Sequence, residues 1–428
     1  MLVDFTIENF RSIKEPVTLS LVAQGRTRKT KVGRKRRGMP SDEEIAPSAP
    51  VEGRGFELLP TLGIFGANAS GKSNVLRALG SLLEFIEVGG VGRTGSSIPV
   101  RFPPFKLDHA CSGIPTRFEL RVALAGSIYT YNLEIDRARI LREKLELIPP
   151  YPKRSQSRLL FDRVWLQDRQ EFHIKNGPDF GESYHEIQMS LQEYEPFMSL
   201  LSRFSIPSVS ELTRWVKRSW LDLTPGSQGL DDLMSVLVLA DKPDWLETTT
   251  RMLRAFDTGI AAIDIEEPEA SGERYNVVVG HNTNGGQVRW GIEEESAGTR
   301  RLFGFSAKLL SALGSGSLVL IDELSSSIHP NIARAIVRLF QSEKANPRHA
   351  QLIFTSHDNT LQRGNLMRRD QIWFTEKRDD GSTDLYPLTD FRPRNDLALD
   401  KAYLDGRFGA VPIIPLDEDL IAALETSR

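Results

Sequence analysis

The sequence contains one cysteine, Cys111, among its 428 residues, and this scarcity excludes two kinds of structure. A single cysteine can form no intrachain disulfide, and it supplies too few thiolates for a cysteine metal cluster. Because structural disulfides are typical of oxidising compartments, we expect this protein in a reducing cytoplasm.

Long apolar runs are also missing. No stretch approaches the roughly 18 apolar residues that a membrane span needs. The segment MLVDFTIENF has neither the basic start nor the apolar run of a signal peptide. Internal repeats and extended heptads are absent as well. The composition, 40% hydrophobic and 26% charged, is instead typical of a soluble globular protein with a sizeable core.

Net charge is only −3, but the charges are unevenly distributed. Residues 25–38, GRTRKTKVGRKRRG, hold eight Lys and Arg and no acid, whereas the rest has 46 basic against 57 acidic residues. A protein that grips a duplex over a broad face is usually basic as a whole. We interpret this segment as part of a mobile, solvated insertion at about 24–56, with contact to nucleic acid or an acidic partner as the alternative.

The apolar pattern predicts a mostly parallel sheet with helices on it. Alternating residues predict a first strand at 3–7 paired with one at 17–21, then a buried strand at 59–66, a helix over 75–86 and a meander within 116–148. Helical spacing dominates residues 190–258, and strands return at 275–280 and 287–292. After residue 300 the order is helix, buried strand, helix 330–344 and buried strand. The sheet therefore draws on both chain ends.

Residues 66–73, GANASGKS, match the pattern G-x-x-x-x-G-K-[ST] between a predicted strand and a predicted helix. Glycines let the backbone curl so that its N–H groups point at phosphate oxygens, and the helix N-terminus adds positive charge. Lys72 can reach the β- and γ-phosphates, and the Ser73 hydroxyl can ligate Mg²⁺. The predicted nucleotide-binding residues are Gly66, Asn68, Ala69, Ser70, Gly71, Lys72, Ser73 and Asn74.

An acidic pair and a histidine follow the two buried strands near the C-terminus. Asp322 and Glu323 end the strand SLVLI, where ligands bind in open α/β sheets. Asp322 suits Mg²⁺, and Glu323 is placed to polarise the attacking water. His357 ends the strand LIFTS and should emerge beside them, able to contact the γ-phosphate or the water. The alternative for Asp322 and Glu323 is a helix cap with an acid in the first turn, and the alternative for His357 is an ordinary surface residue. The glycine loop upstream favours the catalytic interpretation of all three.

Residues 295–301, ESAGTRR, form a second small-residue turn that opens a predicted helix. Loop, turn, acidic pair and histidine, in this order, resemble the ABC-type ATPases, in which such a turn is the signature motif. The resemblance implies that Ser296, Gly298 and Thr299 bind the γ-phosphate of ATP held by a partner chain, so that two ATP molecules lie in a dimer interface. A simple helix cap at Ser296 is the alternative.

Within that class the chain resembles the RecF/SMC/OLD branch. The segment FTIENFRSI is similar to its N-terminal strand, which implies that Arg11 and Ser12 lie near the nucleotide, and DELSSSIHP is similar to its Asp-Glu and His-Pro pattern, with a D-loop at about 326–329. LMRRDQIWFTEK and KAYLDGRFGAVP resemble predicted AAA-family ATPases of bacterial anti-phage and restriction-linked loci, including RloA and the ATPase of the PARIS system. One departure is PFKLD, residues 104–108, which occupies the Q-loop location without a glutamine.

These resemblances imply a P-loop ABC-type α/β fold with a mixed sheet and an inserted, mainly helical lobe. We expect an N-terminal core half at 1–148, the lobe at 149–270 and a C-terminal core half at 271–428. ATP and Mg²⁺ are the implied cofactors, and a homodimer or higher oligomer with ATP at its interface is the implied assembly.

The leading functional hypothesis is an ATPase that senses infection and controls a separate effector, a nuclease or toxin. OLD proteins carry a C-terminal Toprim nuclease, but the 71 residues after His357 contain no Glu plus Asp-x-Asp set on strands that would bind two metals. The segment DEDL near the end follows a proline-broken segment, and we interpret it as an exposed tail. We therefore expect no intrinsic nuclease, and a Toprim nuclease as one candidate partner. The alternatives are a RecF-like DNA-binding repair ATPase and an ATP-stabilised scaffold with negligible turnover. A GTPase is disfavoured because the sequence contains no Asn-Lys-x-Asp motif, which would read the guanine base.

Overall fold

The computed structural model describes residues 1–24, 48–89, 101–150, 156–178, 191–204, 206–222, 235–267, 275–363, 366–394 and 397–412. The basic segment 25–38 therefore lies outside the described residues, as does most of the predicted insertion around it.

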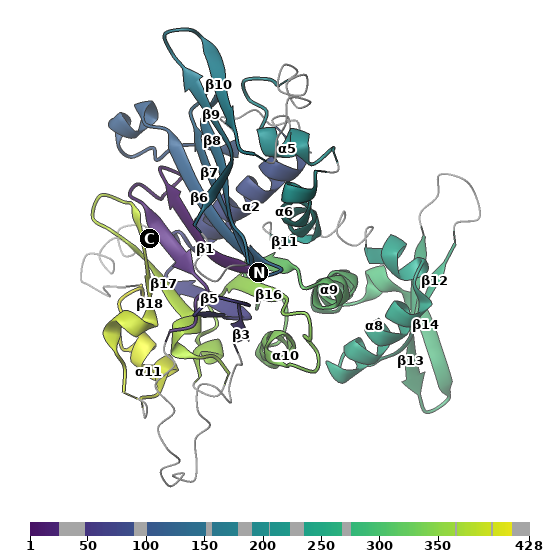
Figure 1. Ribbon diagram of the computed structural model, residues 1–428. Helices are drawn as coiled ribbons and strands as arrows, with labels where there is room; N and C mark the ends of the chain where they lie inside the picture. Colours follow the sequence, from purple (N-terminus) through teal and green to yellow (C-terminus); the bar gives the residue numbers. More distant parts are fainter. Residues whose placement is uncertain are drawn as a thin grey trace, which may run out of the picture.

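A six-stranded sheet carries the centre of the molecule (Figure 1). Its strands lie in the order β11-β15-β16-β5-β17-β18, and the first five are parallel whereas β18 pairs antiparallel with β17. The sheet is thus mixed, as predicted, and it draws on both ends of the chain. The strands are β5 (Thr61–Gly66), β11 (Trp220–Asp222), β15 (Leu318–Ile321), β16 (Gln351–Thr355), β17 (Ile372–Lys377) and β18 (Thr383–Pro387).

The central strands are apolar throughout because both faces of this sheet are covered. Leu318 and Leu320 of β15 pack in the core on one side, and Val319 and Ile321 pack in the core on the other. All six residues of β5 are buried as well. Strands buried on two faces read as continuous apolar runs, which is why the sequence identified them.

A seven-stranded antiparallel sheet forms a second layer, in the order β10-β9-β8-β7-β6-β1-β2. Helix α2 (Lys72–Val88) lies between the two sheets, and its apolar positions are buried in the core that they share. Helices α5 (Phe197–Leu201) and α6 (Pro207–Arg218) pack against α2. The strands are β1 (Leu2–Glu8), β2 (Val17–Ser20), β6 (Thr116–Leu124), β7 (Ser127–Ile135), β8 (Ile140–Ile148), β9 (Arg158–Leu166) and β10 (Glu171–Asn176).

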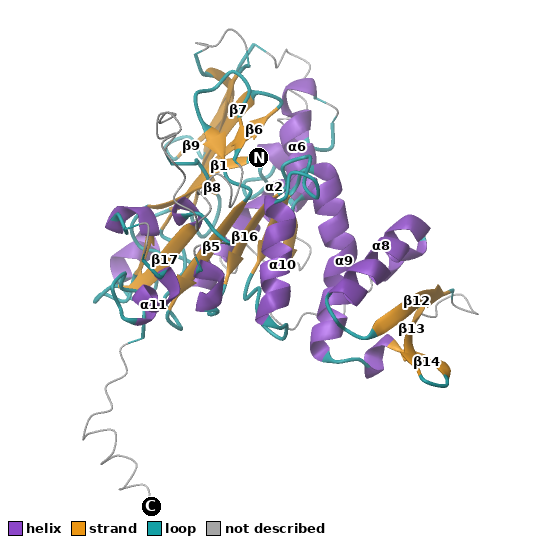
Figure 2. Ribbon diagram, turned by 90° about the horizontal axis from the view of Figure 1, so that it is seen from below, coloured by secondary structure: helices purple, strands orange, loops and turns teal. Residues whose placement is uncertain are grey.

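A smaller lobe stands beside these two sheets. Figures 1 and 2 show helix α8 (Pro243–Ala255) and the three-stranded sheet β12-β13-β14 set apart from the main body, with the long helix α9 (Ala297–Ser315) beside them. We refer to α8 and β12–β14 as the lateral lobe. Its strands are β12 (Ile260–Glu266), β13 (Asn276–Thr283) and β14 (Gly286–Gly291).

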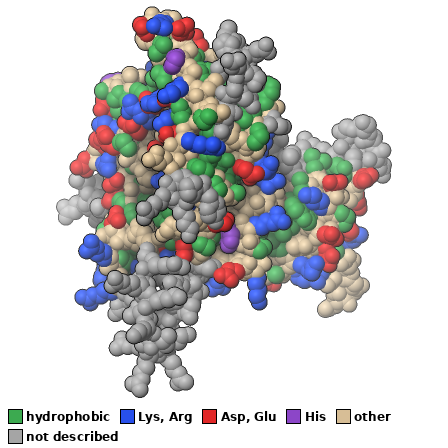
Figure 3. Space-filling model, viewed as in Figure 1, with side chains coloured by type: hydrophobic (Ala, Val, Ile, Leu, Met, Phe, Trp, Pro, Cys, Tyr) green, Lys and Arg blue, Asp and Glu red, His purple; other side chains and the backbone are tan. Residues whose placement is uncertain are grey.

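The remaining elements are short or lie at the periphery. They are β3 (Ala49–Pro50), β4 (Glu57–Leu58), α10 (Pro330–Gln341), α11 (Leu399–Leu404) and the single 3₁₀ turns η1 (His109–Gly113), η3 (Ile292–Glu294), η4 (Asn359–Gln362), η5 (Arg369–Gln371) and η6 (Leu388–Phe391). Within the part of the chain that the structure describes, each helix is too short or too polar to cross a lipid bilayer. On the face shown in Figure 3, basic and acidic side chains are interspersed.

The structure confirms the paired first strands, the buried strands and the helix after the glycine loop, and it corrects three details. Strand β12 lies just after the stretch 190–258 of predicted helical spacing and was not predicted, because a register shift between Ile260 and Ala262 leaves Ile260 and Ile263 both buried, a helical spacing. Strand β11, three residues that pair with β15, lies inside that stretch. Helix α10 ends at Gln341, since Ser342 is extended.

Candidate nucleotide site

The glycine loop joins the central strand β5 to helix α2. Gly71, the residue before the helix, has a left-handed φ of +105°, in which a side chain is strained. A Cβ atom there would lie only 2.0 Å from Oγ1 of Thr383, so glycine is required for close packing as well. The N–H groups at the start of α2 carry partial positive charge that suits a phosphate. The predicted residues Asn68 and Ala69 are exposed on this turn.

The Lys72 side chain is buried and its ammonium folds back over the loop. Nζ donates hydrogen bonds to the carbonyl oxygens of Gly66, at 2.9 Å, and Ala67, at 3.0 Å. Burial lowers the pKa of Lys72 to about 8, and the nearby carboxylates of Glu323 and Asp322 oppose this lowering. The ammonium is therefore held between the loop and the acidic pair, where it can exchange carbonyl oxygens for phosphate oxygens.

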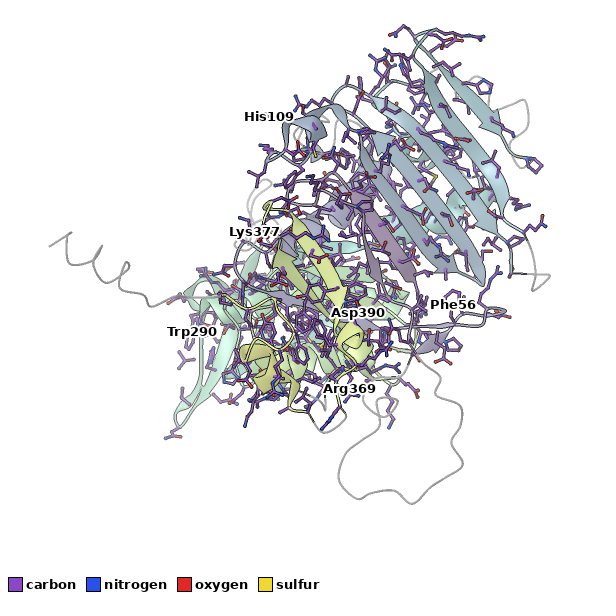
Figure 4. All side chains as sticks on the ribbon, turned by 90° about the vertical axis from the view of Figure 1, so that its left-hand side faces the viewer. Phe56, His109, Trp290, Arg369, Lys377 and Asp390 are labelled. Carbon is purple, nitrogen blue, oxygen red and sulfur yellow. The ribbon has the colours of Figure 1, made fainter. Side chains whose placement is uncertain are left out.

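Two threonines from the C-terminal strands hold the loop in place. The Ser70 hydroxyl lies 2.6 Å from Oγ1 of Thr375 in β17, and Thr383 of β18 donates to the Ser70 carbonyl oxygen at 2.9 Å. Figure 4 shows these two strands, with Lys377 labelled at the end of β17. The conformation of the loop thus depends on residues more than 300 positions away.

Arg11 and Ser12 follow β1, and they lie beside residues of α2. Nδ2 of Asn74 donates to the Ser12 hydroxyl at 2.7 Å, and that hydroxyl also lies 2.7 Å from Oγ1 of Thr383. Partial burial and the neighbouring Arg77 guanidinium lower the pKa of Arg11. Two cationic side chains therefore flank the beginning of the phosphate-loop helix.

Asp322 is almost completely buried where β15 ends. Its Oδ1 accepts hydrogen bonds from the Ser73 hydroxyl at 2.9 Å and from Oγ1 of Thr355 at 2.7 Å. Its Oδ2 lies 3.7 Å from Nη2 of Arg77. The two side chains predicted to bind the metal, Ser73 and Asp322, are thus brought together, with Thr355 and Arg77 completing the setting of the carboxylate.

Glu323 and His357 meet at the same edge of the sheet. Nε2 of His357 lies 3.0 Å from Oε1 of Glu323, and both side chains are partly exposed. Glu323 has a left-handed φ of +59°, uncommon for a non-glycine residue, and its N–H donates to Oγ1 of Thr355 at 2.8 Å. This backbone turn carries the Glu323 side chain away from the strand direction and beside His357.

The oxygen donors of this site fit Mg²⁺. The ion prefers oxygen ligands and is usually held by one or two carboxylates together with substrate phosphates and water. The hydroxyl of Ser73 and the carboxylate of Asp322 are such donors, 2.9 Å apart beside the phosphate loop. The described residues contain no group of three or more His, Cys, Asp and Glu side chains that would form a metal site independent of a nucleotide.

The turn ESAGTRR is a helix cap that faces solvent. Oγ of Ser296 accepts a hydrogen bond from the N–H of Thr299 at 3.1 Å and so caps α9, while Ser296 itself is exposed. Gly298 packs so closely on the D-loop that a Cβ atom would lie 2.4 Å from the carbonyl oxygen of Ser327. Arg301 donates to the carbonyl oxygen of Ser326. The predicted signature turn and D-loop are therefore joined to each other.

Four residues of the site have no counterpart among the sequence predictions: Arg77, Thr355, Thr375 and Thr383. Thr355 lies in the predicted strand LIFTS, two residues before His357, and is the only one of the four that a predicted strand places near the site. The segment PFKLD runs beside the loop after β1, where the N–H of Phe105 donates to Oδ1 of Asn9 at 3.0 Å. The N–H of Arg11 donates to the carbonyl oxygen of Pro103, directly before the segment, at 2.8 Å.

Known families and structures resemble the chain to different degrees. A family described as "AAA domain, putative AbiEii toxin, Type IV TA system" matches residues 62–362. The solved Smc head bound to the C-winged helix domain of ScpA shares 12% identity at a TM-score of 0.46, over 94% of this chain and 99% of that chain. An Smc head domain with a coiled coil and joint derived from Pyrococcus yayanosii shares 11% identity at a TM-score of 0.42, over 94% of this chain and 98% of that chain. No curated protein matches the chain.

Proposed function

The chain belongs to this AAA-domain family, and on that premise we propose that it is an ABC-type ATPase that closes into a dimer around ATP. In this proposal the dimer controls a separate effector, a nuclease or toxin, in anti-phage defence, as in RloA-like and PARIS-like systems. The family description, which names a toxin of a toxin–antitoxin system, supports a role of this kind.

One observation carries the proposal: α2 and α9 both begin at a turn that suits a phosphate. The first is the loop before α2, with Lys72 and the acidic pair. The second is the exposed turn at Ser296, which is packed on the D-loop through Gly298. A helix N-terminus with an exposed serine cap is suited to an anion. A second chain would bring its own loop to this turn, which explains why one chain has both.

The residues at the loop divide the chemistry among them. When bound, Mg²⁺ would neutralise phosphate charge, and Ser73 and Asp322 would hold it. Glu323 is placed to orient a water molecule and accept its proton, and His357, 3.0 Å away, holds the Glu323 carboxylate in position. Lys72 brings positive charge to the phosphates. Positioning and charge compensation of this kind are what phosphoryl transfer chiefly requires.

The first test is the solution mass of a Glu323→Gln variant, measured by light scattering with and without ATP and Mg²⁺. We expect hydrolysis to fall by about 10²–10⁴-fold, the usual contribution of a general base, while ATP drives assembly. A Glu323→Gln chain that also carries Ser296→Arg should bind ATP and stay unassembled. If the solution mass is the same with and without ATP, and the same with and without Ser296→Arg, then ESAGTRR is only a helix cap and the proposed dimer is refuted.

A further inference from the structure

Glu295, the residue directly before the signature serine, is anchored in the lateral lobe. Its Oε1 accepts a hydrogen bond from Nε1 of Trp290 at 2.8 Å and lies 2.7 Å from Nε2 of His281. A carboxylate can only accept, so this histidine nitrogen carries the proton. The Glu295 side chain is only 9% exposed, although the residues on both sides of it, Glu294 and Ser296, are exposed.

The two donors to Glu295, His281 and Trp290, lie side by side on the hairpin of β13 and β14. Trp290 pairs with Val279, two residues from His281, so the two rings are diagonal neighbours on one face of the hairpin. They stack with 4.3 Å between centroids and 10° between planes. Val279 on the same face is fully buried in the core that includes residues of α9. The position of Glu295 is therefore determined by the hairpin, whose Trp290 is labelled in Figure 4.

Beyond Ser296, the signature turn contacts the D-loop, which in turn contacts Glu323 at the edge of the sheet. Gly298 and Arg301 contact the D-loop carbonyl oxygens of Ser327 and Ser326, respectively. The N–H of Ser326 in turn donates to the carbonyl oxygen of Glu323 at 2.9 Å. A continuous set of contacts therefore runs from the hairpin through Glu295 and the signature turn to the residue placed to activate water.

We propose that Glu295 is a positioning residue, through which the lateral lobe sets the signature turn in the geometry that receives the partner chain's nucleotide. This inference rests on the proposed function. Glu295 itself faces the hairpin, so it acts through Ser296 and Gly298. A tilt of the hairpin, whether produced by a bound partner or by a substitution, moves the signature turn and leaves the phosphate loop of the same chain untouched.

The test compares assembly with nucleotide binding in the Glu323→Gln background. Glu295→Ala is expected to raise the protein concentration needed for ATP-driven assembly by about tenfold or more, because two donors to a buried charged acceptor lose their partner. Glu295→Gln keeps one oxygen and should recover most of the assembly. Trp290→Phe removes one donor and should have a smaller effect in the same direction. The exposed neighbour provides the control, and Glu294→Ala should assemble as the parent does.

A second readout separates positioning from loss of fold. A fluorescent ATP analogue, titrated at protein concentrations below assembly, should bind Glu295→Ala with the parent's affinity, because the phosphate loop is intact. Assembly of Glu295→Ala at the parent's concentration, while Ser296→Arg fails to assemble, would overturn this inference alone. If Ser296→Arg also assembles normally, the proposed function fails first. Should Glu295→Ala unfold, an unchanged assembly of Trp290→Phe would equally overturn the inference.

Discussion

At the scale of single residues, Asp322 and Glu323 are adjacent in sequence and differ sharply in setting. Asp322 is buried and accepts two hydroxyl hydrogen bonds, whereas Glu323 turns through a left-handed backbone into partial exposure beside His357. A buried carboxylate that accepts two hydrogen bonds suits a fixed role such as holding a metal ion. A partly exposed one beside a histidine suits contact with water. The backbone turn at Glu323 is what separates the two roles.

Lys72 gives the site a predictable pH dependence. Burial lowers its pKa in the free protein to about 8, and phosphate oxygens would raise it again. Below pH 8 the ammonium is already charged, so ATP affinity should be nearly independent of this group. Above pH 8 binding must first return a proton to Lys72, and affinity should fall as pH rises, toward about tenfold per pH unit.

Calorimetric titrations in buffers of different ionisation enthalpy check this prediction, because they report proton uptake directly. Between pH 8 and 10 the protein should take up a proton on binding ATP. The same lowered pKa makes the folded state more stable as pH rises between 8 and the ordinary lysine value, since the unfolded chain holds more protons there. Binding without proton uptake at pH 9 would contradict the assignment of Lys72.

The sequence identified the residues of this site that belong to contiguous motifs. Lys72, Ser73 and Asp322 lie in patterns whose spacing has a physical reason. Thr375 and Thr383 were missed because hydroxyl side chains in strands carry no pattern, and their link to Ser70 exists only once β17 has been placed beside β5. The segment IWFTEK entered the sequence analysis only as part of a family resemblance, with no strand predicted and no neighbour in the sheet.

At the scale of secondary-structure elements, helix α9 offers a matched pair of glycines. A Cβ atom at Gly298 would meet the Ser327 carbonyl oxygen at 2.4 Å, whereas one at Gly314 would have nothing within 4 Å. Gly298→Ala should push the first turn of α9 away from the D-loop and weaken ATP-driven assembly. Gly314→Ala, in the exposed last turn, should assemble normally and raise the free energy of unfolding by about 0.5–1 kcal/mol.

Light scattering with ATP and a urea unfolding curve for each variant distinguish these effects. Equal assembly of Gly298→Ala and the parent would show that contact between α9 and the D-loop is dispensable.

Elements were predicted well where burial on two faces gives a continuous apolar run, as in β15 and β16. They were predicted poorly where a bulge changes the spacing, as between Ile260 and Ala262 in β12.

At the scale of the whole molecule, the two proposed anion sites belong to different parts of the chain. The phosphate loop is fixed by α2 between the two large sheets, and the signature turn is fixed by α9 beside the lateral lobe. Each chain would then contribute one half of two composite sites. In the proposed dimer, hydrolysis would be a property of the pair.

Mixing two inactive variants tests this central claim most directly. A Lys72→Ala chain keeps its signature turn but cannot hold phosphates, and a Ser296→Arg chain binds ATP but offers no turn to its partner. Each alone should hydrolyse almost no ATP. Their mixture should recover a substantial part of the wild-type rate, because a mixed dimer has one complete site, built from the loop of one chain and the turn of the other. A mixture as inactive as its components would contradict the account.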